Sequence, residues 1–354
     1  MQNELEKIIK NQILQIGSLP ISEFMRLALL HPQYGYYIKS DPFGRKGDFI
    51  TAPEISQMFG EIIGLWCAEL WLKLGRPDHF ILLECGPGRG TLLRDILRTT
   101  KRIEGFHQSL ELFLLEASPR LRNIQEKVAD EFSLKPNFIE SSQSDLPHKP
   151  TIIIANEWLD ALPIDCYLRE EDQWLEQKIN LDAEENFIFC RTKTLRENWL
   201  SEKFPQIKPG EVLEYCNEAE KALIHFSKHI NSYKGGLLIF DYGYVQPQTK
   251  CTLQAVKNHQ YHHIFSDIGS ADITALVDFS QAINVIKNSS SAELSAEIFL
   301  QGEWLEAHGI NTRASQLKKN ATPEQAAAIE SALKRLTHKD EMGELFKVLT
   351  LINS

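Results

Sequence analysis

The sequence has no pair of cysteines at C-x-x-C spacing, although it contains six cysteines in 354 residues. Cysteines scattered in this way indicate neither a disulfide framework nor a zinc site, and we interpret them as reduced core residues. No run approaches the roughly 18 apolar residues of a membrane span. The stretch from Met1 to Lys7 carries acids and no apolar run, so we expect no secretory signal, no transit peptide and a cytoplasmic location.

Positive charge is also scarce. Lysine and arginine number 38 against 48 aspartates and glutamates, giving a formal net charge of -10. Because a broad nucleic-acid interface needs a basic face, we expect no nucleic-acid partner. Hydrophobic residues at 43% and charged residues at 24% are typical of a soluble globular protein. The length suits one large elaborated domain or two smaller ones.

A glycine-rich stretch stands out among the residues that are present. The apolar run from Phe80 to Leu83 is followed by Glu84, by Gly86, Gly88 and Gly90, and then by apolar residues at helical spacing from Thr91 to Arg98. This pattern predicts a strand, a tight turn and a helix. Glycines tolerate positive φ and leave room for a ligand beside the backbone, and the helix N-terminus offers free amide donors.

The acid before the glycines helps to choose between ligands. Dinucleotide sites use G-x-G-x-x-G, whereas the spacing here is G-x-G-x-G. A carboxylate at Glu84 would repel a pyrophosphate but suits an amino or sulfonium group. The stretch therefore favours S-adenosylmethionine (SAM) over a nicotinamide dinucleotide. An ordinary turn without a ligand remains an alternative.

Strand and helix patterns continue to alternate along the chain. We expect strands at 110–116, 137–140, 151–155 and 235–243, with helices between them, one of which begins behind Ser118 as its N-cap. Such alternation predicts a doubly wound α/β sheet whose ligands bind beyond the carboxyl ends of the strands. The polar residues at four of those ends are Glu84, Glu116, Ser144 with Asp145, and Asn156 with Glu157. Glu116 could accept both ribose hydroxyls, or it could be a solvated strand end.

Two further regions are predicted to surround this sheet. Helical patterns at 4–16, 21–30 and 57–74 flank a polar, glycine- and proline-rich segment at 44–56. We interpret this segment as an active-site lid, with a plain surface connection as the alternative. Short alternating segments at 160–215 predict an antiparallel insertion. We therefore expect N-terminal helices and a lid at 1–75, and one α/β domain at 76–354 with an insertion at about 160–215.

Taken in order, these motifs resemble the MidA-like family of SAM-dependent methyltransferases over nearly the full length. This family includes a mitochondrial complex I assembly factor that methylates an arginine of a partner subunit. The strings that carry the resemblance are Gly47–Ser56, Glu84–Thr91, Glu116–Arg122, Ala155–Pro163, Asp241–Gly243, Gly269–Thr274, Val277–Phe279 and Met342–Lys347. Cys85 and Trp158 depart from the usual pattern without removing a polar group.

The resemblance implies a class I methyltransferase fold with SAM as cofactor. It places the glycine turn around the methionine end of SAM and Glu116 on the ribose. Thr51, Pro53, Ala117, Ser144, Asp145 and Asn156 join the expected cofactor contacts, and Asn156 could hold the SAM amino group. The implied acceptor is an arginine-bearing protein, a respiratory-complex subunit being one candidate.

A guanidinium acceptor needs carboxylates that clamp it and turn one nitrogen toward the methyl group. Glu157 is the first candidate because it ends the fourth strand, and Asp160, Glu54 and Asp241 follow. A structural carboxylate is the alternative for Glu157. Tyr242 and Tyr244 could form an aromatic wall of the acceptor pocket or pack in the core.

Two other functions are also open, whereas a metal site is not expected. The His262–His263 pair with His259 suggests a metal site, but the spacing does not suit one, so we expect none. The chain could act as a SAM-binding assembly factor or chaperone without essential turnover. It could also methylate a small molecule.

Overall fold

The computed structural model describes residues 3–39, 51–289 and 294–354. Its contacts divide the chain into two compact units, each assembled from three chain segments. Unit 1 contains the N-terminal helices with residues 160–219 and 245–278. Unit 2 contains residues 50–159, 220–244 and 279–354, apart from those outside the described ranges.

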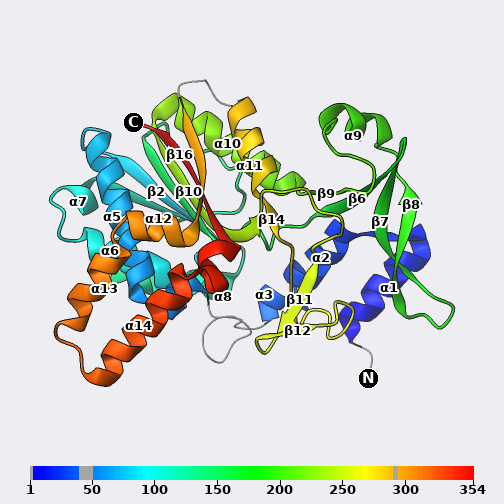
Figure 1. The fold of residues 1–354 in the computed structure, drawn as a ribbon, viewed down its shortest axis with the longest axis horizontal. Helices are drawn as coiled ribbons and strands as arrows, with labels where there is room; N and C mark the ends of the chain where they lie inside the picture. The colour runs from blue at the N-terminus through cyan, green and yellow to red at the C-terminus, as the bar shows by residue number, and fades with distance from the viewer. Residues whose placement is uncertain (1–2, 40–50, 290–293) are drawn as a thin grey trace. The chain divides into compact units, whose positions relative to one another are not determined.

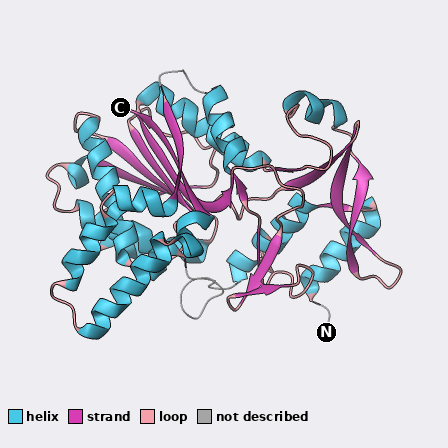
Figure 2. Cartoon of the chain, in the orientation of Figure 1, coloured by secondary structure: helices cyan, strands magenta, loops and turns pink. Residues whose placement is uncertain are grey.

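Unit 2 is built on one twisted sheet with the strand order β15-β16-β10-β5-β2-β3-β4 (Figure 1). The pairs β2–β3, β2–β5, β3–β4 and β5–β10 are parallel, whereas β16 runs antiparallel to β10 and β15. Figure 2 shows these strands side by side. Their bounds are β2 Phe80–Cys85, β3 Leu110–Leu115, β4 Asn137–Ile139, β5 Thr151–Asn156, β10 Gly235–Tyr244, β15 Ser295–Leu300 and β16 Phe346–Asn353.

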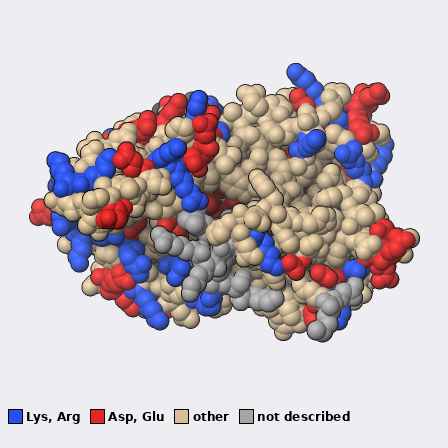
Figure 3. Space-filling model, turned by 60° about the horizontal axis from the view of Figure 1, so that its bottom comes forward, with Lys and Arg blue, Asp and Glu red and all other residues tan. Residues whose placement is uncertain are grey.

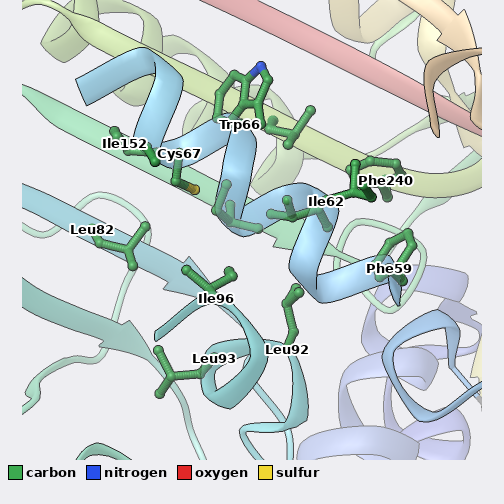
Figure 4. Packing of buried hydrophobic residues seen from close by; sticks show 14 of the residues in the cluster. Phe59, Ile62, Trp66, Cys67, Leu82, Leu92, Leu93, Ile96, Ile152 and Phe240 are labelled. Carbon is green, nitrogen blue, oxygen red and sulfur yellow. The ribbon is translucent and has the colours of Figure 1, made fainter. Parts of the chain in front are cut away.

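The central strands are apolar because helices cover them. Every residue of β2 is buried, as is β5 except at Asn156. Figure 4 shows side chains of helices α5 and α6 packed with Leu82, Ile152 and Phe240 from the sheet. The helices of unit 2 are α4 Ala52–Ile55, α5 Gln57–Lys73, α6 Thr91–Thr100, α7 Phe106–Ser109, α8 Pro119–Asp130, α10 Asn217–Tyr233, α11 Phe279–Ser289, α12 Gln301–Ala307, α13 Ile310–Lys318, α14 Pro323–Thr337 and the π-helical turn η1 Lys339–Gly343, with α10 beginning in unit 1.

Unit 1 packs its helices against antiparallel strands. One sheet has the order β1-β7-β6-β9 with β8 also paired to β7, and a second has the order β12-β11-β13. A separate hydrophobic cluster, which includes Leu5, Ile9, Ile179 and Ile273, fills this unit. Its elements are α1 Glu4–Ile16, β1 Leu19–Pro20, α2 Ile21–Leu30, α3 Tyr36–Lys39, β6 Asp165–Glu170, β7 Gln173–Leu181, β8 Phe187–Lys193, α9 Glu197–Lys203, β9 Val212–Tyr215, β11 Gln254–Lys257, β12 Gln260–His262, β13 Asp272–Thr274 and β14 Val277–Asp278.

The predicted doubly wound α/β sheet and the antiparallel insertion are confirmed. The sheet also contains two strands, β15 and β16, beyond those expected from the sequence. The contacts also group residues 51–75 with the sheet rather than with the N-terminal helices, because α5 is buried along most of its length.

Charged side chains of both signs are interspersed on the face shown in Figure 3. Among the helices of the described ranges, none is both long and apolar enough to span a membrane.

Candidate active site

Three strand ends of unit 2 meet at one edge of its sheet. Cys85 of β2 pairs with Leu115 of β3 on one side and with Ala155 of β5 on the other. Because these strands are parallel, the residues that follow them lie next to one another. The backbone N–H of Gly86 donates to the carbonyl oxygen of Leu115 at 3.0 Å, which ties the glycine turn to the end of β3.

The glycine turn has the conformation that its composition predicts. Gly86, Gly88 and Gly90 have φ of 64°, 52° and 73°, a region that disfavours side chains. A Cβ at Gly86 would also lie 2.9 Å from the Cδ1 atom of Trp158. Gly90 is the N-cap of α6, so the turn leads directly into a helix N-terminus.

Two buried oxygens beside this turn have no hydrogen-bond partner among the described residues. They are Oε2 of Glu84 and Oδ1 of Asn156. Glu84 is only 3% exposed, and burial raises the pKa of its carboxyl to about 8. Buried acceptors normally have donors, so these two suit a ligand that brings its own N–H groups or positive charge. The ammonium and sulfonium groups of SAM meet that requirement.

Glu116 lies directly after β3 and is held by its neighbours. Its Oε1 atom accepts from the backbone N–H of Ser118 at 2.8 Å, and its Oε2 atom accepts from Nε2 of Gln125 at 2.9 Å. Burial raises the pKa of Glu116, and these hydrogen bonds lower it in part. Helix α8 begins where we expected, but Ser118 makes no side-chain capping bond and its Oγ has no partner among the described residues.

Glu157 follows β5 with an unusual backbone. Its φ of 48° is rare for a residue with a side chain, and its N–H donates to the Phe240 carbonyl at 2.8 Å. Oε1 of Glu157 accepts from the Ala52 backbone N–H at 3.0 Å and from Nδ2 of Asn156 at 3.2 Å. Loss of surrounding water raises the pKa of the Glu157 carboxyl, and these hydrogen bonds lower it in part.

Helix α4 brings a second carboxylate to this edge. Oε1 of Glu54 accepts from the hydroxyl of Thr91, the first residue of α6, at 2.5 Å. Thr51 is the N-cap of α4, and Pro53 is buried within it. The part of the predicted lid from residue 44 to 50 lies outside the described residues.

The remaining predicted residues are placed differently. Asp241 is fully buried and accepts from the backbone N–H groups of Leu159 and Tyr242, contacts that suit a structural carboxylate. Asp160 belongs to unit 1, where its carbonyl accepts from the Ala275 N–H. Ser144 and Asp145 lie in the turn after β4, with Asp145 exposed, and Ala117 beside Glu116 is exposed as well.

Sequence reasoning missed three groups at this edge: Gln125, Thr91 and the backbone N–H of Ala52. Of these three groups, only Gln125 could have been identified from a sequence pattern. It shares the buried face of α8 with Leu121, Val128 and Ala129, where helical periodicity expects an apolar residue.

No group of three or more potential ligand side chains within the described ranges has metal-binding geometry. Nε2 of His262 instead lies 3.3 Å from an oxygen of Asp267. The Tyr242 ring packs 5.6 Å from Phe346, which favours core packing for this residue.

Comparison with known proteins agrees with this geometry. Residues 62–298 match the model of a family described as "Putative S-adenosyl-L-methionine-dependent methyltransferase". The chain is 33% identical to the mitochondrial protein arginine methyltransferase NDUFAF7 homolog of Drosophila melanogaster, over 98% of this chain and 84% of that protein. The chain is also 32% identical to the mitochondrial NDUFAF7 of Danio rerio, over 98% of this chain and 86% of that protein.

The fold is shared with a Burkholderia thailandensis protein solved in complex with S-adenosyl-homocysteine. That structure has a TM-score of 0.84 and 24% identity, and the match covers 99% of this chain and 92% of that one. The predicted cytoplasmic location was wrong by comparison with the curated relatives, which are named as mitochondrial. The family match and these full-length similarities agree that the chain is a member of the MidA-like family of SAM-dependent methyltransferases, with SAM as its cofactor.

Proposed function

We propose that this protein transfers a methyl group from SAM to a guanidinium nitrogen of an arginine in a partner protein. The names of the Drosophila and Danio relatives, both called protein arginine methyltransferases, support this acceptor. The observation that carries the proposal is Glu157, which follows β5 beside the glycine turn and uses its Oε1 atom for two intramolecular hydrogen bonds. A respiratory-complex subunit is the partner that the family resemblance suggests.

Glu157 would bind and orient the acceptor. Bound SAM supplies a methyl group on a cationic sulfur. A carboxylate can hold a guanidinium in fixed orientation and turn one nitrogen toward that methyl group. Arginine releases a proton when it is methylated, and a carboxylate whose pKa is raised by desolvation is a better acceptor for it. Glu54, fixed by Thr91, is the second candidate for the clamp.

The cofactor contacts follow from the same edge of the sheet. We assign the unpartnered oxygens of Glu84 and Asn156 to the amino-acid end of SAM, with the turn of Gly86, Gly88 and Gly90 beside it. Glu116 would bind the ribose. Thr51, Pro53, Ala117, Ser144 and Asp145 stay predictions, as do Asp160 and Asp241 among the catalytic candidates.

Radiolabelled methyl transfer tests the acceptor class. The purified protein would be incubated with labelled SAM and a lysate from cells lacking the gene, and labelled proteins would be hydrolysed to amino acids. Label in methylarginine from a protein band supports the proposal. Label in another amino acid or in a small molecule contradicts it.

The variant Glu157→Gln tests the assigned clamp. We expect methyl transfer to fall by about 100-fold or more, because the uncharged amide neither clamps the guanidinium nor accepts its proton. SAM affinity measured by calorimetry should change little. Glu140→Gln is the matched control, since Glu140 is an exposed carboxylate that follows strand β4 of the same sheet. Normal turnover in Glu157→Gln would move the clamp elsewhere.

A further inference from the structure

Gln125 is a fully buried polar side chain that links two parts of the candidate cofactor site. It lies on the inward face of α8 with an exposure of 0%. Its Nε2 group donates to the Gly88 carbonyl at 2.7 Å and to Oε2 of Glu116 at 2.9 Å. Both hydrogens of one planar amide are therefore used, one on each partner.

The two partners come from different strand ends. Gly88 belongs to the turn between β2 and α6, and Glu116 follows β3. Because a single NH2 group bonds both, their separation and the direction of the Glu116 carboxylate are set together. Oε1 of Gln125 has no partner among the described residues, so the amide carries the cost of an unsatisfied buried acceptor. An apolar side chain would avoid that cost, which indicates that the two donated bonds matter.

We propose that Gln125 is a positioning residue for SAM, fixing the turn at the methionine end of the cofactor relative to the carboxylate at its ribose. This inference rests on the cofactor contacts proposed above. Gln125 itself acts through Gly88 and Glu116. Its loss should weaken SAM more than 5′-methylthioadenosine, which lacks the amino-acid end and so does not require both parts at once.

Two substitutions separate positioning from simple packing. Gln125→Leu removes both donors. Gln125→Glu keeps the shape, but a carboxyl group has at most one hydrogen and cannot donate to both partners. It also places a second carboxyl beside Glu116, and two carboxyls this close cannot both ionise readily. The affinity of Gln125→Glu for SAM, expressed relative to wild type, should therefore fall as pH rises and the shared proton is lost.

Gln301 offers a matched control in the same unit. It is also 0% exposed, its Nε2 donates to the Leu336 carbonyl at 2.9 Å, and its Oε1 also lacks a partner among the described residues. This hydrogen bond goes to neither Gly88 nor Glu116. Gln301→Leu and Gln301→Glu thus carry the same burial penalty without the proposed role.

The experiment is calorimetric titration of the full-length variants with SAM and with 5′-methylthioadenosine at pH 6 and pH 8. We expect Gln125→Leu to weaken SAM binding about tenfold or more, since it removes two hydrogen bonds from the site. Relative to wild type at the same pH, Gln125→Glu should bind SAM more weakly at pH 8 than at pH 6, a relative change that neither Gln301 variant shows. If Gln125→Leu fails to fold, the pH dependence of Gln125→Glu decides the question.

Failure of this inference can be told apart from failure of the cofactor site by including Glu116→Ala. If Glu116→Ala loses SAM affinity while both Gln125 variants match their Gln301 controls, the positioning role is overturned and the site stands. If Glu116→Ala binds SAM normally, the proposed ribose contact fails and the role of Gln125 fails with it.

Discussion

Among individual residues, Glu84 combines deep burial with a free acceptor oxygen. Its pKa is raised to about 8 by burial, so the ligand-free carboxyl is mostly protonated at pH 7. A cationic ligand stabilises the ionised form. Binding of SAM should therefore release a proton from Glu84, which connects cofactor affinity to pH.

We predict that the affinity for SAM rises with pH up to about 8, by no more than about tenfold per pH unit for one proton released. Calorimetry at pH 6, 7 and 8 measures this. The Glu84→Gln variant should bind SAM more weakly, and its SAM affinity should lack the pH dependence that the Glu84 proton causes. The amino group of SAM titrates near about 7.7–8.0 itself, so the difference between wild type and variant is the quantity to compare. Equal pH profiles for the two proteins would exclude the assigned contact.

At the scale of elements, the approach of helix α5 to helix α6 depends on small residues. A Cβ at Gly64 would lie 3.0 Å from Cβ of Thr99 and 3.2 Å from the Ile96 Cα atom. The second neighbour is backbone and cannot rotate away. Close contact between these helices in turn supports the hydrophobic core shown in Figure 4.

We predict that Gly64→Ala destabilises the protein by about 1–3 kcal/mol through overpacking. Helix propensity alone predicts the opposite, a gain of about 0.8–1.0 kcal/mol for replacing glycine with alanine. Urea unfolding followed by circular dichroism distinguishes the two outcomes. Leu65→Ala is the control, because Leu65 is 49% exposed on the same helix. A more stable Gly64→Ala protein would mean that the helices lie farther apart.

On the scale of the whole molecule, neither unit is a continuous stretch of chain. Unit 1 needs α1 and α2 to complete a core that also contains Ile179 and Ile273, residues far along the sequence. A truncation at one end of the chain therefore opens a core formed elsewhere.

We predict that deleting residues 1–30 unfolds unit 1. The deletion removes Leu5, Ile9, Ile13 and Phe24, each 2% exposed or less. Burial of such a side chain contributes about 1.5–3 kcal/mol, and the total rivals the stability of a typical domain. Hydrogen exchange should show lost protection in β6 and β7 and retained protection in β2 and β5. Leu14→Ala, at a 67% exposed position of α1, is the control. Unchanged protection in β7 would show that unit 1 folds without these helices.

Local patterns in the sequence determined the strand, turn and helix around Glu84 and the alternation that defines the sheet. Apolar periodicity and glycine conformation act over a few residues, so they can be read without knowing the fold. The polar residues at the ends of the parallel strands were found in the same way. The same patterns identified α1 and α2 with the bounds that the structure has.

Only the tertiary structure decided which of these residues meet. Gln125 contacts Gly88 across 37 positions, and Ala52 contacts Glu157 across 105. It also showed that β16 lies between β10 and β15, antiparallel to both, and that the Asp241 carboxylate accepts hydrogen bonds from two backbone N–H groups. Such contacts depend on how distant segments pack, and each involves residue types that occur equally well on surfaces. Apolar periodicity indicates which face of a helix or strand is buried, but it does not indicate which other element packs against that face.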